Sequence, residues 1–314
     1  MAFPLVSIII PNWNGADHLK GLLKSLSELN YPKESMEIII VDNGSCDRSQ
    51  EIIKNEYQIM QPQGWHALKL IENKRNQGAP AAYNQAINAS APYCEFFLKL
   101  DNDILIERNC LRAMVNEMAL DERIGAIGPK IYYFNDRIRL NFAGGKLNKL
   151  TCNTKHIGCG EIDRGQYDEK CEVDFLTGCV TLISRLCVED VGMFDEKYYW
   201  YYDELDFLYR AKRRGWKLLY LPIKGAWHKI ENRKKQVSLL GSYYFTRNRL
   251  YFAWKNCRPF FIAVFVTSFR YAILPHLLKM RWDYLRMNII GYSDFFKGRM
   301  GEKLELARKN WTAP

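Results

Sequence analysis

"FFLKLDNDILIE", residues 96–107, combines an apolar run with two charged side chains, and this combination decides the fold. Residues 95–100 have the continuous apolar character of a strand that is buried on both faces. Asp101 and Asp103 follow directly, before the apolar stretch 104–106. Ionised carboxylates beside a core are costly unless they are paired or bind a metal. The stretch therefore predicts a strand whose end carries either a ligand site or a solvated turn.

The residues on either side repeat this strand at regular intervals. Apolar runs at 6–10, 37–41 and 67–71 predict three more strands, and helical spacing of apolar residues predicts helices between them. This alternation predicts an α/β fold with a doubly wound, mostly parallel central sheet flanked by helices. We expect one such domain over residues 1–235 and a basic, apolar helical extension over 236–314.

Polar residues follow each predicted strand. In parallel sheets, ligands bind beyond the carboxyl ends of the strands, so these residues should meet at one edge. The candidates are Asn12 and Asn14 after the first strand, Asp42 after the second, Asn76 after the third, and Asp101 and Asp103 after the fourth.

The two aspartates of the opening stretch suit a divalent metal. Mg²⁺ and Mn²⁺ bind carboxylate oxygens together with phosphate oxygens, and a turn is the alternative. Asp42 could hydrogen-bond a nucleoside or simply shape a turn, and both can hold. His228, in "GAWHK", follows a later predicted strand and could contact metal or phosphate, or be structural.

Three acidic residues, Asp203, Glu204 and Asp206, begin a predicted helix that ends before Gly215. Acidic residues in a first turn favour the helix dipole, which is the simplest explanation. Crowded carboxylates also raise one another's pKa, which suits a general base near neutral pH. We favour a base in this cluster. The Gly- and Asn-rich residues 130–172 predict a β-rich insertion, and 173–185 predicts a strand interrupted at Gly178.

The net charge of +10 is concentrated near the end of the chain. Residues 247–314 hold thirteen Lys/Arg and four Asp/Glu, a net of +9. Residues 259–278 form the most apolar run, but its uncharged part is only eleven residues long. A spanning helix needs roughly 18–20 apolar residues, so we expect an interfacial membrane contact, or a helical cap on the domain. A basic and apolar tail fits a lipid surface better than nucleic acid.

Several classes of protein are disfavoured. No G-x-x-x-x-G-K-[ST] loop is present and no G-x-G-x-x-G follows the first strand, which argues against P-loop NTPases and dinucleotide dehydrogenases. The start of the chain predicts no signal peptide, and the nine scattered cysteines predict reduced thiols. We therefore expect a cytoplasmic location, peripheral on the cytoplasmic face of the plasma membrane.

The ordered motifs resemble those of family 2 inverting glycosyltransferases, which have the GT-A fold. The motifs are "VSIIIPNWNG", "EIIIVDNGSCDRS", "NQGAPAAYNQAI", "LKLDNDILIE", "FLTGCVTLISR", "VGMFDEKYYWYYDELDFLYRAKRRGWKLLYLP" and "AWHK". The match covers residues 5–230. The later segment "SYYFTRNRLYFAWKN" is similar to rhamnosyltransferase-like members that build bacterial surface polysaccharides.

The resemblance implies roles for particular positions. The residues that bind the donor nucleotide would be Pro11, Asn12, Asn14, Asp42, Asn76, Gly78, Asn84, Asp101 and Asn102. Mn²⁺ or Mg²⁺ would be held by Asp103, with Asp101 and His228 beside it. Gly178, Cys179 and Asp206 would lie at the acceptor. Glu204 aligns with the family's base, but the order Asp203-Glu204 reverses the usual Glu-Asp and leaves the choice open.

The expected activity is metal-dependent transfer of a sugar from a nucleoside-diphosphate sugar to a glycan or lipid-linked acceptor. Two alternatives remain. A nucleotidyltransferase should carry a basic glycine-rich loop after the first strand, yet no Lys or Arg occurs in residues 11–19. A non-catalytic sugar-nucleotide or glycan-binding membrane subunit would not need the acidic cluster.

Overall fold

The computed structural model describes residues 3–230 and 238–303, so the expected domain boundary at 235/236 lies outside the described residues. The strands are β1 (Val6–Asn12), β2 (Met36–Asp42), β3 (Ala67–Glu72), β4 (Phe96–Leu100), β5 (Ile104–Ile106), β6 (Ile124–Tyr133), β7 (Asp136–Phe142), β8 (Gly145–Asn148), β9 (Asn153–His156), β10 (Cys171–Glu172), β11 (Val180–Ser184) and β12 (Lys217–His228). The helices are α1 (Ala16–Ser27), α2 (Ser49–Met60), α3 (Ala79–Ala89), α4 (Cys110–Met118), α5 (Arg185–Val191), α6 (Asp203–Arg213), α7 (Leu239–Asn256), α8 (Phe261–Ala272), α9 (Leu274–Leu278) and α10 (Trp282–Phe296).

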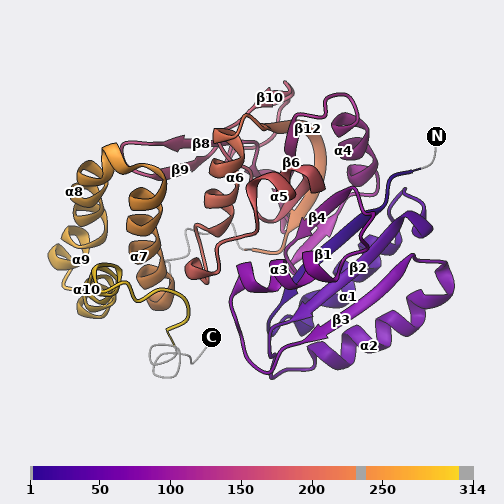
Figure 1. The fold of residues 1–314 in the computed structure, drawn as a ribbon, viewed down its shortest axis with the longest axis horizontal. Helices are drawn as coiled ribbons and strands as arrows, with labels where there is room; N and C mark the ends of the chain where they lie inside the picture. The colour runs from indigo at the N-terminus through magenta and orange to yellow at the C-terminus, as the bar shows by residue number, and fades with distance from the viewer. Residues whose placement is uncertain (1–2, 231–237, 304–314) are drawn as a thin grey trace.

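The central sheet confirms the predicted alternation (Figure 1). Its order is β10-β12-β6-β11-β4-β1-β2-β3, and β3, β2, β1 and β4 are mutually parallel. The isoleucines of β1 and β2 are fully buried, because helices cover the sheet and leave no solvated face.

The second half of the sheet is mixed. β11 runs antiparallel to both β4 and β6, while β12 is parallel to β6. β4, β6 and β12 therefore point the same way, and β11 starts at the edge where they end. The strand predicted over 173–185 forms only from Val180, because Gly178 and Cys179 form a turn directly before it. The β-rich character predicted for 130–172 is confirmed by β7, β8, β9 and β10.

Helices α7 to α10 form a lobe at one end of the molecule (Figure 1), which we call the helical lobe. In it α7 packs against α8 and α10, and it also packs against α6 of the main body. Residues Arg258–Leu278 are long and apolar enough to cross a membrane by length and composition alone, with a mean hydropathy of 1.6 and only 17% of the segment buried. This segment of 21 residues is longer than its uncharged part, which is residues 259–269.

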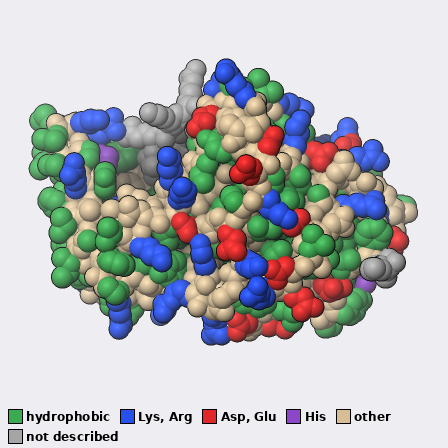
Figure 2. Space-filling view, turned by 90° about the horizontal axis from the view of Figure 1, so that it is seen from above, with side chains coloured by type: hydrophobic (Ala, Val, Ile, Leu, Met, Phe, Trp, Pro, Cys, Tyr) green, Lys and Arg blue, Asp and Glu red, His purple; other side chains and the backbone are tan. Residues whose placement is uncertain are grey.

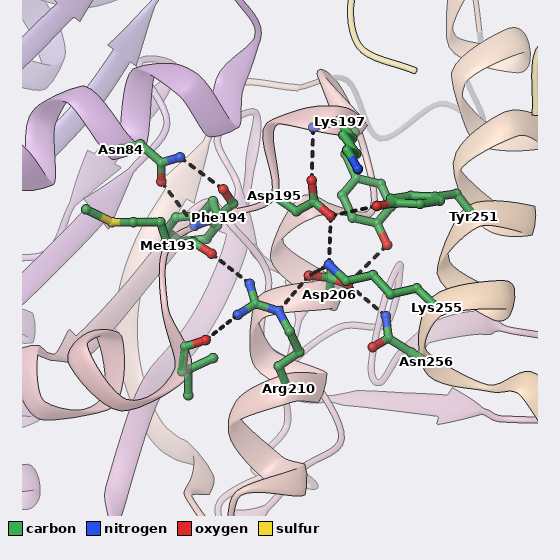
Figure 3. A network of polar contacts seen from close by, with 12 residues as sticks. Asn84, Met193, Phe194, Asp195, Lys197, Asp206, Arg210, Tyr251, Lys255 and Asn256 are labelled. Atoms are coloured by element: carbon green, nitrogen blue, oxygen red, sulfur yellow. Dashed lines mark hydrogen bonds and ion pairs between the residues drawn. The ribbon is translucent and has the colours of Figure 1, made fainter. Parts of the chain in front are cut away.

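A buried polar network joins the helical lobe to α6 (Figure 3). Asp206 is fully buried and accepts hydrogen bonds from Arg210 Nε at 2.8 Å, Lys255 Nζ at 2.9 Å and Asn256 Nδ2 at 2.7 Å. The hydroxyl of Tyr198 donates to the same carboxylate at 3.1 Å. Because Lys255 and Asn256 belong to α7, this one carboxylate connects the two parts of the molecule.

We expect Asp206→Ala to lower the free energy of unfolding by about 3–5 kcal/mol, because partly buried Arg210 loses its carboxylate partner and the buried donors of Tyr198 and Asn256 lose their acceptor. Urea denaturation at pH 7 measures this, with the exposed Glu122→Ala as the control. A loss below about 1 kcal/mol would contradict a joining role for this carboxylate.

Candidate active site

The carboxyl ends of the parallel strands meet at one edge, as predicted. The side chain of Asn12 donates to Asp42 Oδ1 at 2.8 Å, and Asn102 Nδ2 donates to Asn12 Oδ1 at 2.8 Å. Pro11 lies beside them near the end of β1, in register with Val41 of β2. Side-chain hydrogen bonds thus join the ends of β1 and β2 to the residues that follow β4.

Asp42 is fully buried and shapes the turn that follows β2. Its carboxylate accepts from Asn12, from the backbone N–H and hydroxyl of Ser45, and from Gln50. Asn14 adopts a left-handed φ of 50°, and its N–H donates to the Ser45 hydroxyl at 2.8 Å. The turn role considered for Asp42 is therefore present, and it joins the two loops at this edge. Its contact with a nucleoside stays a prediction.

The loop after β3 docks against the segment that leads into α6. Asn76 Oδ1 accepts from the N–H of Gly78 at 2.8 Å, and the N–H of Ala79 donates to the carbonyl of Tyr199 at 3.0 Å. Gly78 has a φ of 90°, and a Cβ there would lie 2.5 Å from that same carbonyl. Only glycine allows this close approach, which sets the predicted donor loop beside the acidic helix.

A second cluster forms where β4, β11 and β12 meet. Ligand atoms of Asp101, Cys179 and His228 lie within 4.8 Å of one another. His228 Nε2 is 3.2 Å from Asp103 Oδ2, and its Nδ1 is 3.4 Å from Cys179 Sγ. The pairing of His228 with Ile104 explains this arrangement, because it places the end of β12 beside the aspartate that precedes β5.

The charges of this cluster stabilise one another. Burial opposes ionisation of Asp103, but the hydrogen bond and charge of His228 lower the pKa of this carboxyl. Burial likewise opposes a charged imidazole, but hydrogen bonds to Cys179 and Asp103 and the charge of Asp103 raise the pKa of His228. Burial raises the pKa of the Cys179 thiol, which keeps the thiol protonated.

This set of side chains fits a divalent cation. Two carboxylates and an imidazole are ligands that Mn²⁺ accepts, and carboxylates also suit Mg²⁺. A protonated thiol is a poor ligand for either ion. Asp101, Asp103 and His228 are therefore the residues that could hold a metal. Cys179, expected at the acceptor, lies beside them.

Glu204 is held by a buried lysine. Lys99 of β4 is 1% exposed, and its ammonium contacts the Glu204 carboxylate and donates to the carbonyl of Gly178 at 2.8 Å. Burial opposes the ammonium, but the charges of Glu204 and Asp101 raise the pKa of Lys99. A Cβ on Gly178 would lie 1.6 Å from a carboxylate oxygen of Glu204, so this glycine makes room for the acid.

Asp203 lies behind Glu204 and is far less accessible. It is 4% exposed, and its Oδ2 has no hydrogen-bond partner among the described residues. Burial and the charge of Glu204 raise its pKa from the ordinary value of 3.8 to about 7. The Glu204 side chain is 32% exposed. Of the two candidate bases, Glu204 is the one an external molecule can reach.

Two predicted site residues do not reach this edge. Asn84 is buried, and its side chain bonds to the backbone of Phe194 (Figure 3). The same amide donates to the carboxylate of Glu196. Asp206 is fully buried in the network that holds α7. Sequence reasoning also missed Lys99, although a lysine inside the apolar run "FFLKL" was a visible signal that it has a buried counterion.

Comparisons with known proteins identify the family of the chain. A sequence profile described as Glycosyl transferase family 2 matches residues 7–191, and the chain belongs to this family. It is 27% identical over 223 residues to a poly-beta-1,6-N-acetyl-D-glucosamine synthase of Staphylococcus aureus (strain MSSA476), which covers 71% of this chain and 49% of that protein. The chain thus spans about half the length of the curated relatives it matches.

Solved structures share the fold. S. aureus TarS 1-349 in complex with UDP-GlcNAc has a TM-score of 0.61 at 17% identity, covering 93% of this chain and 80% of that one. GalNAc-T7 with UDP, GalNAc and Mn²⁺ has a TM-score of 0.64 at 18% identity, covering 99% and 59%. Mannosyltransferase PcManGT from Pyrobaculum calidifontis, with GDP-Man and Mn²⁺, has a TM-score of 0.58 at 17% identity, covering 98% and 79%. The α/β fold is of the GT-A type, as the sequence predicted.

The buried carboxyl of Asp203 makes stability depend on pH. Its pKa is higher in the folded chain, so its contribution to stability is complete below pH 4 and is lost as pH rises through about 7. We expect Asp203→Asn to gain stability relative to the unmodified chain between pH 5 and pH 8, by about 2 kcal/mol. Urea denaturation at both pH values measures this. Identical pH dependence in the two proteins would contradict it, and Glu122→Gln is the control.

Proposed function

We propose that this chain is an inverting glycosyltransferase that moves a sugar from a nucleoside-diphosphate sugar to a hydroxyl of a glycan or lipid-linked acceptor. The product would contribute to a cell-surface polysaccharide or glycoconjugate. One observation carries the proposal: a single sheet edge holds the donor-side loops, the cluster of Asp101, Asp103 and His228, and the acid pair Asp203 and Glu204. These are the parts that a single displacement on a sugar nucleotide requires.

Glu204 would act as the general base. Its carboxylate takes the proton from the acceptor hydroxyl, and that oxygen attacks the anomeric carbon from the face opposite the nucleotide. The bond to the diphosphate breaks and the diphosphate leaves with the electron pair, so the anomeric centre inverts. Lys99 holds the Glu204 carboxylate in place, and Gly178 leaves room for it because it has no side chain.

A divalent cation held by Asp101, Asp103 and His228 would stabilise the charge of the departing diphosphate. We propose Mn²⁺ or Mg²⁺ for this role. The imidazole of His228 favours Mn²⁺, and the Mn²⁺ complexes of two structural neighbours support it.

The sugar is the least constrained part of the proposal. The UDP-GlcNAc complex of TarS and the name of the synthase support an N-acetylhexosamine donor carried on UDP. The similarity of "SYYFTRNRLYFAWKN" to rhamnosyltransferase-like members supports a dTDP-linked deoxysugar instead. Both are hexosyl-type transfers through the same site.

A nucleotide-release screen tests the proposal. UDP-, GDP- and dTDP-sugars are each supplied with Mn²⁺, Mg²⁺ or a chelator, and we expect release of a nucleoside diphosphate that the chelator abolishes. Release of pyrophosphate from a nucleoside triphosphate and sugar phosphate would instead indicate a nucleotidyltransferase. Donor binding without turnover on any glycan or lipid-linked acceptor would indicate a binding subunit.

We expect Glu204→Gln to lower kcat by roughly 10²–10⁴-fold, because the amide cannot accept the proton. KM for the donor should change little, because the role proposed for Glu204 is to take a proton from the acceptor and not to bind the nucleotide. Steady-state nucleotide release measures both constants, with Glu122→Gln as the matched control. A kcat near that of the unmodified enzyme, combined with a larger loss in Asp203→Asn, would assign the base to Asp203.

The helical lobe would contact the membrane, with the enzyme peripheral on its cytoplasmic face. Figure 2 shows hydrophobic side chains gathered over the lobe end of the molecule, with Lys and Arg among them. Ile262 of α8 is 78% exposed and Leu278 of α9 is 74% exposed. Exposed apolar residues beside cations are typical of surfaces that bind anionic lipid.

We expect the double variant Ile262→Ser with Leu278→Ser to bind anionic vesicles roughly tenfold more weakly, because two apolar side chains no longer enter the lipid. Vesicle co-sedimentation measures this. Ile59→Ser, which alters an isoleucine of α2 that is 65% exposed, is the matched control. Equal binding by both variants would argue that the lobe serves only as a cap.

A further inference from the structure

A cavity of about 450 Å³ lies between the β8–β9 hairpin and the helical lobe, and we call it the lobe pocket. Its size is within the range of sites for small molecules. Asn153 and Thr154 of β9 form one side, and α7, α8, α9 and α10 form the others. Tyr202 also lines it, and this residue directly precedes Asp203. The lobe pocket therefore adjoins the segment that carries the acid pair.

Arg249 of α7 lines this pocket and is 6% exposed. Its Nε donates to the carbonyl of Thr151 at 2.8 Å, and its Nη2 donates to the Thr267 hydroxyl at 3.1 Å. A guanidinium has five N–H donors, so these two bonds leave most of its capacity available. Among the described residues, no carboxylate pairs with it. Burying a guanidinium without a counterion costs free energy, and a bound anion would offset this cost.

Two other buried cations each contact a carboxylate: Lys99 contacts Glu204, and Lys130 contacts Asp163. Arg247 has no carboxylate partner among the described residues, but its donors are satisfied by the side chains of Asn248 and Tyr243 and by the carbonyls of Lys197, Tyr198 and Gly301. Arg249 also lies over the ring of Tyr271, 5.8 Å from its centroid, so within the described part of the chain it is a buried cation that lines a cavity without a counterion.

A second polar group also lines the lobe pocket. Ser268 of α8 is fully buried, and its hydroxyl lies beside that of Tyr292, which is also buried. A hydroxyl that accepts a hydrogen bond from this neighbour can still donate one to a ligand oxygen. Arginine and hydroxyl donors together are typical of sites for phosphate groups.

The remaining lining mixes polar side chains with a group of aromatic ones. Phe245, Tyr271 and Tyr284 line the cavity, and Tyr284 stacks on His276 with 5.0 Å between ring centroids. Tyr271, which lines the pocket, and Leu274 are exposed, and both belong to the apolar segment Arg258–Leu278. A ligand here would have an anionic head and a hydrocarbon chain that continues over α8 and α9.

We propose that the lobe pocket binds the phosphate head of an amphiphile, with Arg249 and Ser268 as its donors. This rests on the proposed function, in which a lipid-linked acceptor would place its phosphate in the lobe pocket and its sugar near Glu204. The same head group occurs on membrane phospholipids, so the chemistry has two sources that experiment can separate.

The test measures binding of farnesyl phosphate to the full chain by isothermal titration, below the micelle concentration and without a donor. We expect Arg249→Gln to weaken binding roughly tenfold or more, because charge-assisted hydrogen bonds are lost. Arg270→Gln, which removes an exposed arginine of α8, should bind as the unmodified chain does. Farnesol, which lacks the phosphate, should bind at least tenfold more weakly.

A second variant keeps the proposal testable if Arg249→Gln does not fold. Ala272→Phe fills the lobe pocket while leaving Arg249 in place, and it should also weaken farnesyl phosphate binding. Circular dichroism verifies the fold of each variant. Equal affinity of the unmodified chain and the folded variants, or equal affinity for farnesol, would overturn the proposal.

Vesicles containing phosphatidylglycerol separate the two sources. If Arg249→Gln weakens both vesicle binding and farnesyl phosphate binding, the pocket takes a phospholipid head group. If Arg249→Gln weakens only farnesyl phosphate binding, the pocket takes the lipid-linked acceptor. In that case KM for the acceptor should rise, while KM for the donor should stay unchanged. Since binding is measured without turnover, failure of the glycosyl transfer proposal would leave this result intact.

Discussion

The structure depends on how three neighbouring carboxylates in the first turn of α6 are accommodated, two of them buried and one within reach of water. Each carboxylate has different partners. Asp206 is paired with Arg210 and Lys255, Glu204 is paired with Lys99, and Asp203 has an oxygen with no partner among the described residues. Buried charge is tolerated only where counter-charges and hydrogen bonds offset desolvation, so the positions of β4, α6 and α7 are mutually dependent.

The helical lobe is consequently part of the machinery that shapes the site. Arg247 and Asn248 of α7 donate to the carbonyls of Tyr198, Trp200 and Tyr201, in the segment that leads into α6. This segment has left-handed φ values at Tyr199, Tyr201 and Tyr202, a conformation that costs free energy in residues with side chains. Contacts with α7 stabilise it, and through it the position of the acid pair. A lobe that both meets lipid and holds the base would keep the reaction close to the membrane.

Much of the fold and part of the site could be predicted from the sequence. Apolar periodicity predicted the first four strands, and strand direction alone brought Asn12, Asp42, Asp101 and Asp103 to one edge. Asp206 was assigned to the acceptor because residue type does not reveal whether a carboxylate is used by the protein or left for a ligand. The same ambiguity misplaced the amide of Asn84, whose partners lie more than a hundred residues away in the chain.

The sequence by itself determined the α/β alternation, the polar strand ends and the family, because these follow from local periodicity and short ordered motifs. Only the tertiary structure decided that β11 reverses direction, which sets Gly178 against Glu204 and Cys179 against His228. It also decided that Glu204 is accessible while Asp203 is enclosed, and that Arg249 faces a cavity without a counterion. The reason is physical: burial and pairing of charge depend on distant segments that local sequence does not specify.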